Sequence, residues 1–154
     1  MNFNASGIIE TVRRDELKQI LSNAGLSVSF PVSGFNSNRD SVASLEFEIG
    51  SIQITAFAIS NVNYDWDLVP VDTVLFVIDI SPENSVLTNM PLDASDIFKD
   101  NIEGSGIGNL TASDAGINYS RVVALKGGIS VRNLLEQVNM LVAVGNMLTV
   151  YKES

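Results

Sequence analysis

Residues 44–56 read SLEFEIGSIQITA, and apolar and polar residues alternate almost throughout this stretch. Such alternation is typical of a β-strand with one buried face and one solvent-exposed face. The pair Gly50-Ser51 interrupts the alternation, and a two-residue link containing glycine is typical of a tight hairpin turn. The stretch therefore predicts an antiparallel β-hairpin, with Glu46 and Glu48 on its solvent-exposed face.

Upstream of the hairpin, the sequence predicts a helix followed by a short strand. Apolar residues recur with helical spacing between Leu17 and Ala24, which predicts a helix over about 8–24. Gly25 follows at once and can adopt the left-handed conformation that closes a helix. Apolar residues then alternate with serines, which predicts a half-buried strand over 26–32.

Downstream of the hairpin, we expect two more strands and two more helices. The run TVLFVIDI at 73–80 is apolar almost throughout, so we expect a strand that is covered on both faces. A short acidic helix is predicted over 93–102, with its first aspartate as the cap. The run YSRVVALK at 119–126 predicts a further strand, and Ser130 can cap a final helix that extends to about Tyr151.

The final helix is apolar over more of its circumference than one sheet normally covers. A helix of this kind is either enclosed within its own domain or shared with a partner. We expect the second case, a homodimer, because two-fold dimers are the commonest closed assemblies. The residues expected at the dimer interface are Leu135, Val138, Leu141, Val142 and Met147.

Together these elements predict an α+β fold. We expect a single domain over residues 1–154, with an antiparallel sheet of about five strands packed against an N-terminal helix and a long C-terminal helix. A chain of this length can bury about 70% of the surface that it exposes when unfolded. The hydrophobic content of 45% also argues against a disordered chain.

The order of the elements resembles the type III secretion chaperone-like architecture, which the YbjN-related bacterial proteins share. The stretches SVLTNMPLDASDIF (85–98) and RVVALKGGISVRNLLEQVNML (121–141) also resemble the YjfI-like bacterial family. The resemblance implies an antiparallel sheet with helices on one face and, for the chaperones, a small acidic dimer that binds another protein. Neither resemblance includes a catalytic motif, so neither assigns a functional residue.

The composition excludes several classes of enzyme site. The chain contains no His and no Cys, which are the usual general base, thiol nucleophile and zinc ligands. Catalysis by carboxylate, lysine or tyrosine stays open, but no pair of such groups is visibly placed for opposite protonation states. We therefore predict a protein that is not an enzyme, with no catalytic residue and no bound cofactor.

The net charge of -9 is concentrated in one segment. Between Asp65 and Glu103 the chain has nine acidic residues and one base, Lys99, whereas the remainder is almost neutral. An acidic surface repels nucleic-acid phosphates and anionic membranes, so we expect neither as a partner. We expect another protein instead, for which a basic surface would be complementary. The N-terminus lacks the basic start and apolar run of a signal peptide, which predicts a cytoplasmic location.

The acidic segment also contains the residues that we expect to contact that partner. Trp66 lies between Asp65 and Asp67, and tryptophan is enriched at binding hot spots. The alternative is a tryptophan that covers the core. A second function stays open, a regulatory protein that binds a small molecule or a divalent cation through the carboxylates of 65–103. The spacing of a calcium-binding loop is absent, so we predict no metal-ligating residue.

Overall fold

The computed structural model describes residues 7–30, 44–59, 66–86, 108–113 and 116–149, and the structural statements below concern these residues. In chain order the elements are β1 (Ile8–Ile9), α1 (Arg14–Asn23), β2 (Val28–Ser29), β3 (Ser44–Ile49), β4 (Ile52–Ala58), β5 (Thr73–Ile80), the short 3-10 turn η1 (Pro82–Asn84), β6 (Asn109–Ser113), β7 (Gly116–Ala124), β8 (Ile129–Ser130) and α3 (Val131–Leu148).

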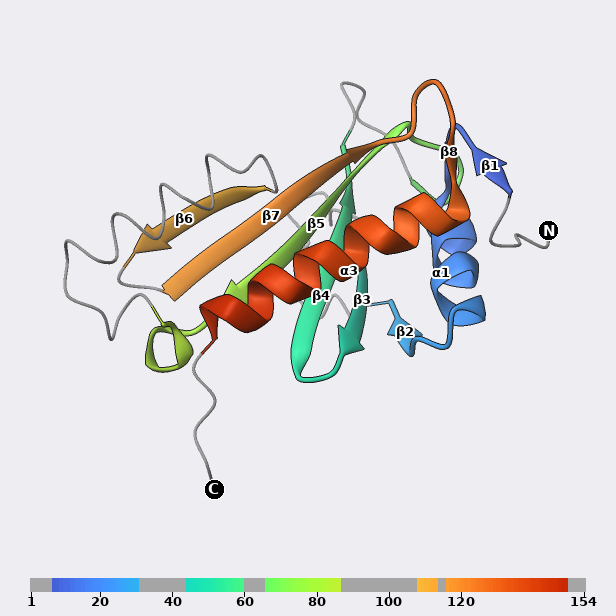
Figure 1. Cartoon of the computed structure of the whole chain (residues 1–154). Coiled ribbons are helices and arrows are strands. Elements are labelled where there is room, and N and C mark those ends of the chain that lie inside the picture. The colour runs from blue at the N-terminus through green and yellow to red at the C-terminus, as the bar shows by residue number, and fades with distance from the viewer. Residues whose placement is uncertain (1–6, 31–43, 60–65, 87–107, 114–115, 150–154) are drawn as a thin grey trace, which may run out of the picture.

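The predicted α+β fold is confirmed. The strands form an antiparallel sheet of six, in the order β2-β3-β4-β5-β7-β6, and a separate antiparallel pair of β1 with β8. Helix α3 crosses one face of the large sheet (Figure 1), where it contacts β4, β5 and β7. Helix α1 packs near β2 and β3. Buried residues from both helices and from the sheet make up the hydrophobic core.

The predicted hairpin is present as β3 and β4. The two strands pair in register up to Ile49 and Ile52, which flank a two-residue turn. Gly50 has a φ of 64°, and the tight hairpin turns need a positive φ at this position. Phe47 and Ile54 pair across the hairpin and are buried. The glutamates lie on the opposite and more exposed face, as predicted.

Strand β5 has the predicted bounds, but its two faces differ. Val74, Phe76 and Ile78 are buried on the face that α3 covers. Leu75 and Val77 point to the other face and are only partly buried. Among the described residues α3 packs on one face of β5 only (Figure 1), so the prediction that both faces are covered is not confirmed.

Helix α1 begins six residues later than predicted. Residues 8 and 9 form β1, and Val12 exchanges main-chain hydrogen bonds of 2.9 and 3.0 Å with Val71. The N–H of Arg13 donates to the Glu16 carboxylate at 2.9 Å, so the chain turns into the helix after Arg13. The β-branched residues before that point favour the extended backbone. The end of the helix is as predicted, with Gly25 at a φ of 92°.

Several short strands differ from the prediction or were missed by it. Of the strand predicted over 26–32, the described residues 26–30 show strand at Val28–Ser29 alone, and residues 31 and 32 lie outside the described residues. Strands β1, β6 and β8 were not predicted, because two to five residues carry too little periodicity to be recognised. Strand β7 begins three residues earlier and ends two residues earlier than predicted. The short acidic helix predicted over 93–102 lies outside the described residues.

Helix α3 starts at the predicted cap, where the Ser130 hydroxyl accepts the Asn133 N–H at 3.0 Å. It ends at Leu148, and Tyr151 lies outside the described residues. Gly145 lets the helix approach the sheet closely, since a Cβ at this position would lie 2.8 Å from the Ile78 Cδ1 atom. In the described structure neither helix is long and apolar enough to cross a membrane.

The expected dimer interface is wrong for three of its five residues, because α3 lies so close to the sheet that their side chains are buried. Val138, Leu141 and Val142 are 1%, 0% and 8% exposed, so their side chains lie in the core of the chain itself. They are unavailable to a partner in this conformation, because the six-stranded sheet is wide enough to cover the side of α3 on which they lie. Leu135 is partly buried against the core. Of the five expected residues, Met147 alone is largely exposed.

Candidate functional site

Trp66, which we expected at a partner surface, belongs to the core. Its side chain is 1% exposed, and its Nε1 donates a hydrogen bond of 2.9 Å to the Val12 carbonyl. A hot-spot tryptophan must be accessible before the partner binds, so the prediction for Trp66 is wrong and the core-covering alternative is correct. Asp65 lies outside the described residues.

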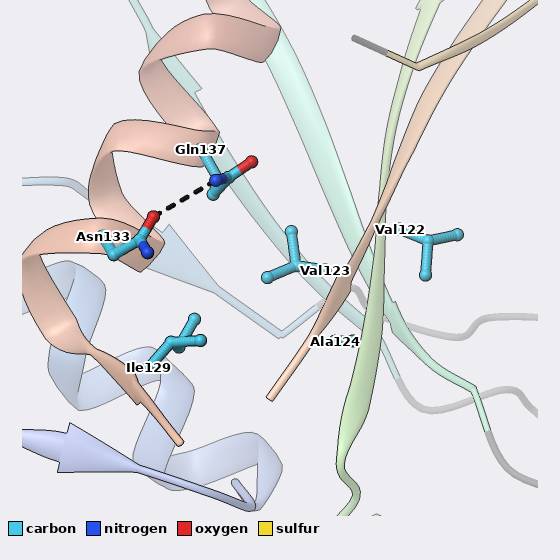
Figure 2. Close-up of a pocket in the computed structure, with 6 residues that line it drawn as sticks. All are labelled: Val122, Val123, Ala124, Ile129, Asn133 and Gln137. Atoms are coloured by element: carbon cyan, nitrogen blue, oxygen red, sulfur yellow. Dashed lines mark hydrogen bonds between the residues drawn. The ribbon is translucent and has the colours of Figure 1, made fainter. Parts of the chain in front are cut away.

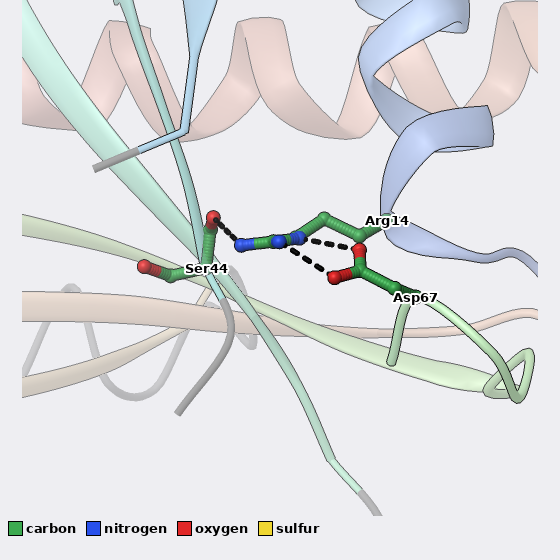
Figure 3. Close-up of polar contacts among 3 residues, drawn as sticks. All are labelled: Arg14, Ser44 and Asp67. Carbon is green, nitrogen blue, oxygen red and sulfur yellow. Dashed lines mark hydrogen bonds and ion pairs between the residues drawn. The ribbon is translucent and has the colours of Figure 1, made fainter. Parts of the chain in front are cut away.

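Asp67 forms an internal ion pair with helix α1 (Figure 3). Its two carboxylate oxygens accept hydrogen bonds of 2.7 Å from Nε and Nη2 of Arg14. The same guanidinium donates to the Ser44 carbonyl at 3.4 Å and lies 4.3 Å from the ring centroid of Phe30. Because both oxygens bind one guanidinium, Asp67 joins its segment to α1 and is not an open contact for a partner.

The described carboxylates of the acidic segment do not gather into a cation site. No group of three or more potential metal ligands occurs among the residues that the structure describes. Asp72 accepts a hydrogen bond from its neighbour Thr73 at 3.0 Å, and Asp79 accepts one from Asn118 at 2.6 Å. Both carboxylates therefore accept hydrogen bonds from side chains of the sheet. The acidic residues from 93 to 103 lie outside the described residues.

A different surface combines an open strand edge with a pocket. Strand β6 pairs with β7 only from Ser113↔Gly116 to Asn109↔Ser120, whereas β7 continues to Ala124. Within the described ranges, no strand lies beside residues 122–124 on this side of β7. Among the described residues, the end of β7 is therefore an edge, although the rest of the strand is internal to the sheet. Residues 105–107, which would follow the β6 register opposite 122–124, lie outside the described residues.

The ladder with β5 shows which main-chain groups face this edge. The Leu125 N–H donates to the Asp72 carbonyl at 2.7 Å, so the main-chain hydrogen-bonding groups of Leu125 point to the β5 side of the strand. Alternate residues of an antiparallel pair exchange hydrogen bonds with the partner strand. The N–H and C=O groups of Val123 therefore also point to β5. The N–H and C=O groups of Val122 and Ala124 point to the open edge. Both residues are exposed, Val122 to 56%.

The pocket lies between this edge and the first half of α3 (Figure 2). It has a volume of about 170 Å³ and is lined by Val122, Val123, Ala124, Ile129, Asn133 and Gln137. The Val123 side chain points toward α3, and the Val122 side chain points away from it. The pocket thus offers an apolar floor beside a row of main-chain donors and acceptors.

Two amide side chains form the polar side of the pocket. The Arg121 Nε donates to the Gln137 Oε1 at 2.6 Å, and the Gln137 Nε2 donates to the Asn133 Oδ1 at 3.1 Å. These bonds fix the orientation of both amides. The Asn133 Nδ2 has no partner among the described residues, so it is a donor that a ligand could use.

Sequence reasoning missed this site. Asn133 and Gln137 occur at i and i+4 of the predicted final helix, so their common face could be recognised. The open edge could not, because it depends on where β6 stops beside β7. No family model, curated protein or solved structure matches the chain.

Proposed function

We propose that this chain is a non-enzymatic protein-binding protein, which takes up an extended peptide segment of its partner as an added strand along the end of β7. The observation that carries the proposal is the open edge at Val122 and Ala124. Their main-chain donors and acceptors match those of an extended peptide, which is the requirement for strand addition. The pocket beside the edge would receive one side chain of that peptide.

The pocket also suggests what that side chain is. Successive side chains of a strand point to opposite faces, so the residue opposite Val123 would lie over the pocket on the α3 side. There it would meet the Asn133 Nδ2, which is a donor, and the Arg121 guanidinium nearby. A hydrogen-bond acceptor such as Asp, Asn or Ser fits this position best. Its neighbours would extend the apolar face of Val122, where β-branched residues fit best.

The short edge limits the affinity. Four main-chain hydrogen bonds at about 1 kcal/mol net each would supply about 4 kcal/mol, which corresponds to a Kd of about 1 mM. The side chain in the pocket must supply the remainder, so affinity depends on the amides as well as on the edge. We therefore expect variants at Asn133 to change peptide selectivity, and variants that remove an edge donor to weaken all peptides.

A chaperone-like or regulatory role in the cytoplasm is part of this proposal. The absence of cysteine fits a reducing compartment. The resemblance of the element order to the secretion chaperone-like proteins stays a prediction. The cation-binding alternative has no support from the described carboxylates, since Asp67 binds Arg14.

Amide hydrogen exchange of the free protein tests whether the edge is open. We expect the Val122 and Ala124 amides to exchange quickly, because they point to solvent. The Val123 and Leu125 amides should exchange slowly, because they bond toward β5. Slow exchange at all four positions would mean that another part of the chain already covers the edge, and the proposal would fail.

Peptide selection then tests the function itself. Short random peptides are selected on the immobilised protein, and the amides protected by a selected peptide are mapped by hydrogen exchange. We expect new protection at Val122 and Ala124. Ala124→Pro removes one outward N–H and should weaken binding by about 5-fold or more, whereas the control Ala124→Val keeps the N–H and the affinity. Selected peptides that protect only other surfaces would refute the proposal.

A further inference from the structure

The outer face of the large sheet, opposite α3, carries a row of three apolar side chains that runs across β4, β5 and β7. Phe57 pairs with Leu75, and Leu75 pairs with Val122. Phe57 and Leu75 are partly buried, whereas Val122 is 56% exposed and points away from α3 (Figure 2). Directly paired side chains on one face of a sheet contact each other. We call these three residues the apolar row, and Val122 is its exposed end.

The neighbouring row on the same face shows where a fourth member of the apolar row would lie. Val77 pairs with Ser120, and Ser120 pairs with Asn109 of β6. That row therefore extends over the edge strand, where it ends in a polar side chain. Strand β6 begins at Asn109, so within the described ranges no residue lies beyond Val122. A strand added along the end of β7 would supply that residue.

We propose that the partner peptide places a large apolar residue, aromatic or β-branched, opposite Val122 as the fourth member of the apolar row. This inference rests on the proposed strand addition and deepens it, because it names the side chain that the outer face selects. Aromatic and β-branched residues pair more favourably across strands than alanine does. Such a side chain would also cover the exposed part of Val122, which removes apolar surface from water.

The peptide position opposite Ala124 should be less selective. Ala124 pairs with Thr73, so a small and a polar side chain stand where the apolar row has valine and leucine. The peptide residue over the pocket, opposite Val123, lies between these two outer positions. The partner is therefore an extended peptide in which a bulky apolar residue directly adjoins the hydrogen-bond acceptor on one side, while the residue on its other side is variable.

A double-mutant cycle tests the contact with Val122, using a peptide selected on the wild-type protein and the same peptide with its bulky residue replaced by alanine. On the wild type, this replacement should weaken binding by about 5-fold. Val122→Ala keeps the main-chain groups but removes the contact, so the replacement should then cost about 2-fold or less. The matched control Val77→Ala makes the same change in the neighbouring row and should keep the larger loss. An equal loss on all three proteins would overturn the inference.

The selected peptides also separate this inference from the proposed function. Peptides that protect the Val122 and Ala124 amides, yet carry no bulky apolar residue beside the acceptor, would leave the strand addition in place and refute the role of the apolar row. Peptides that protect neither amide would refute the strand addition and, with it, this inference.

The chain's own Ile107 is the alternative occupant, because the register of β6 would continue to it opposite Val122. Ile107 lies outside the described residues, and Ile107→Ser tests the alternative. We expect the variant to bind a selected peptide with a Kd within about 2-fold of the wild-type value. Binding that becomes about 5-fold tighter or more would show that Ile107 competes for this place, and it would overturn the assignment to a partner.

Discussion

Among the described residues, the hydroxyl of Tyr119 is the one buried side-chain polar group without a hydrogen-bond partner. The side chain itself is fully buried. Leaving a buried hydroxyl unpaired costs about 1–3 kcal/mol. The backbone of Gly108 lies close to this hydroxyl, because a Cβ at that position would be 2.7 Å from the oxygen atom. The ring fills the core, while its polar end contributes nothing to stability.

Replacing this tyrosine with phenylalanine should therefore be harmless or favourable. We expect Tyr119→Phe to leave the free energy of unfolding unchanged or to raise it by about 1 kcal/mol, since the variant keeps the ring and removes the unpaired group. Urea denaturation measures the change. A loss of more than about 1 kcal/mol would show that the hydroxyl has a partner in solution.

The same variant should also change the response to alkaline pH. Burial raises the pKa of Tyr119 above its ordinary value of 10.0, and the nearby charge of Arg121 partly lowers it. Below pH 10 both the folded and the unfolded chain keep this proton. Above it the unfolded chain loses the proton first, so stability falls as the pH rises. The fall between pH 10 and 11 should be smaller in Tyr119→Phe than in the wild type.

Trp66 and Asp67 are neighbours in sequence, yet their side chains should contribute different amounts to the free energy of unfolding. Trp66→Ala removes a fully buried indole and should cost about 3–5 kcal/mol. Asp67→Asn weakens an ion pair whose side chains are 20% and 42% exposed, and such pairs contribute about 1 kcal/mol or less. Urea denaturation of both variants measures the difference. Equal losses would contradict the larger contribution that we expect from the indole.

At the scale of elements, the sequence predicts a helix or strand correctly where neighbouring residues alone determine it. The hairpin follows from the alternation around Gly50, and the cap of α3 follows from Ser130. The start of α1 was missed because β1 forms by pairing with distant β8. The candidate site could not be predicted for a similar reason, since Val122 is an edge residue of the described sheet only because β6 begins opposite Ser120.

The contact between α3 and β5 makes a prediction about two elements together. Alanine is about 1 kcal/mol better than glycine inside a helix, but a Cβ at Gly145 would meet the Ile78 Cδ1 at 2.8 Å. We expect Gly145→Ala alone to be neutral or destabilising. In the Ile78→Val background, where that methyl is absent, the same change should stabilise the chain by about 1 kcal/mol. Additive effects of the two changes in urea denaturation would contradict the close contact.

At the scale of the whole molecule, sequence reasoning identified the fold class but misplaced the exposed surface of α3. The side of α3 that includes Leu141 is apolar. The spacing of apolar residues in the sequence cannot show how much of this side a sheet will cover. That depends on the width of the sheet and on the depth at which Gly145 seats the helix. Once both are known, the outer side of the helix, with Met140 and Met147, is what the sheet leaves exposed.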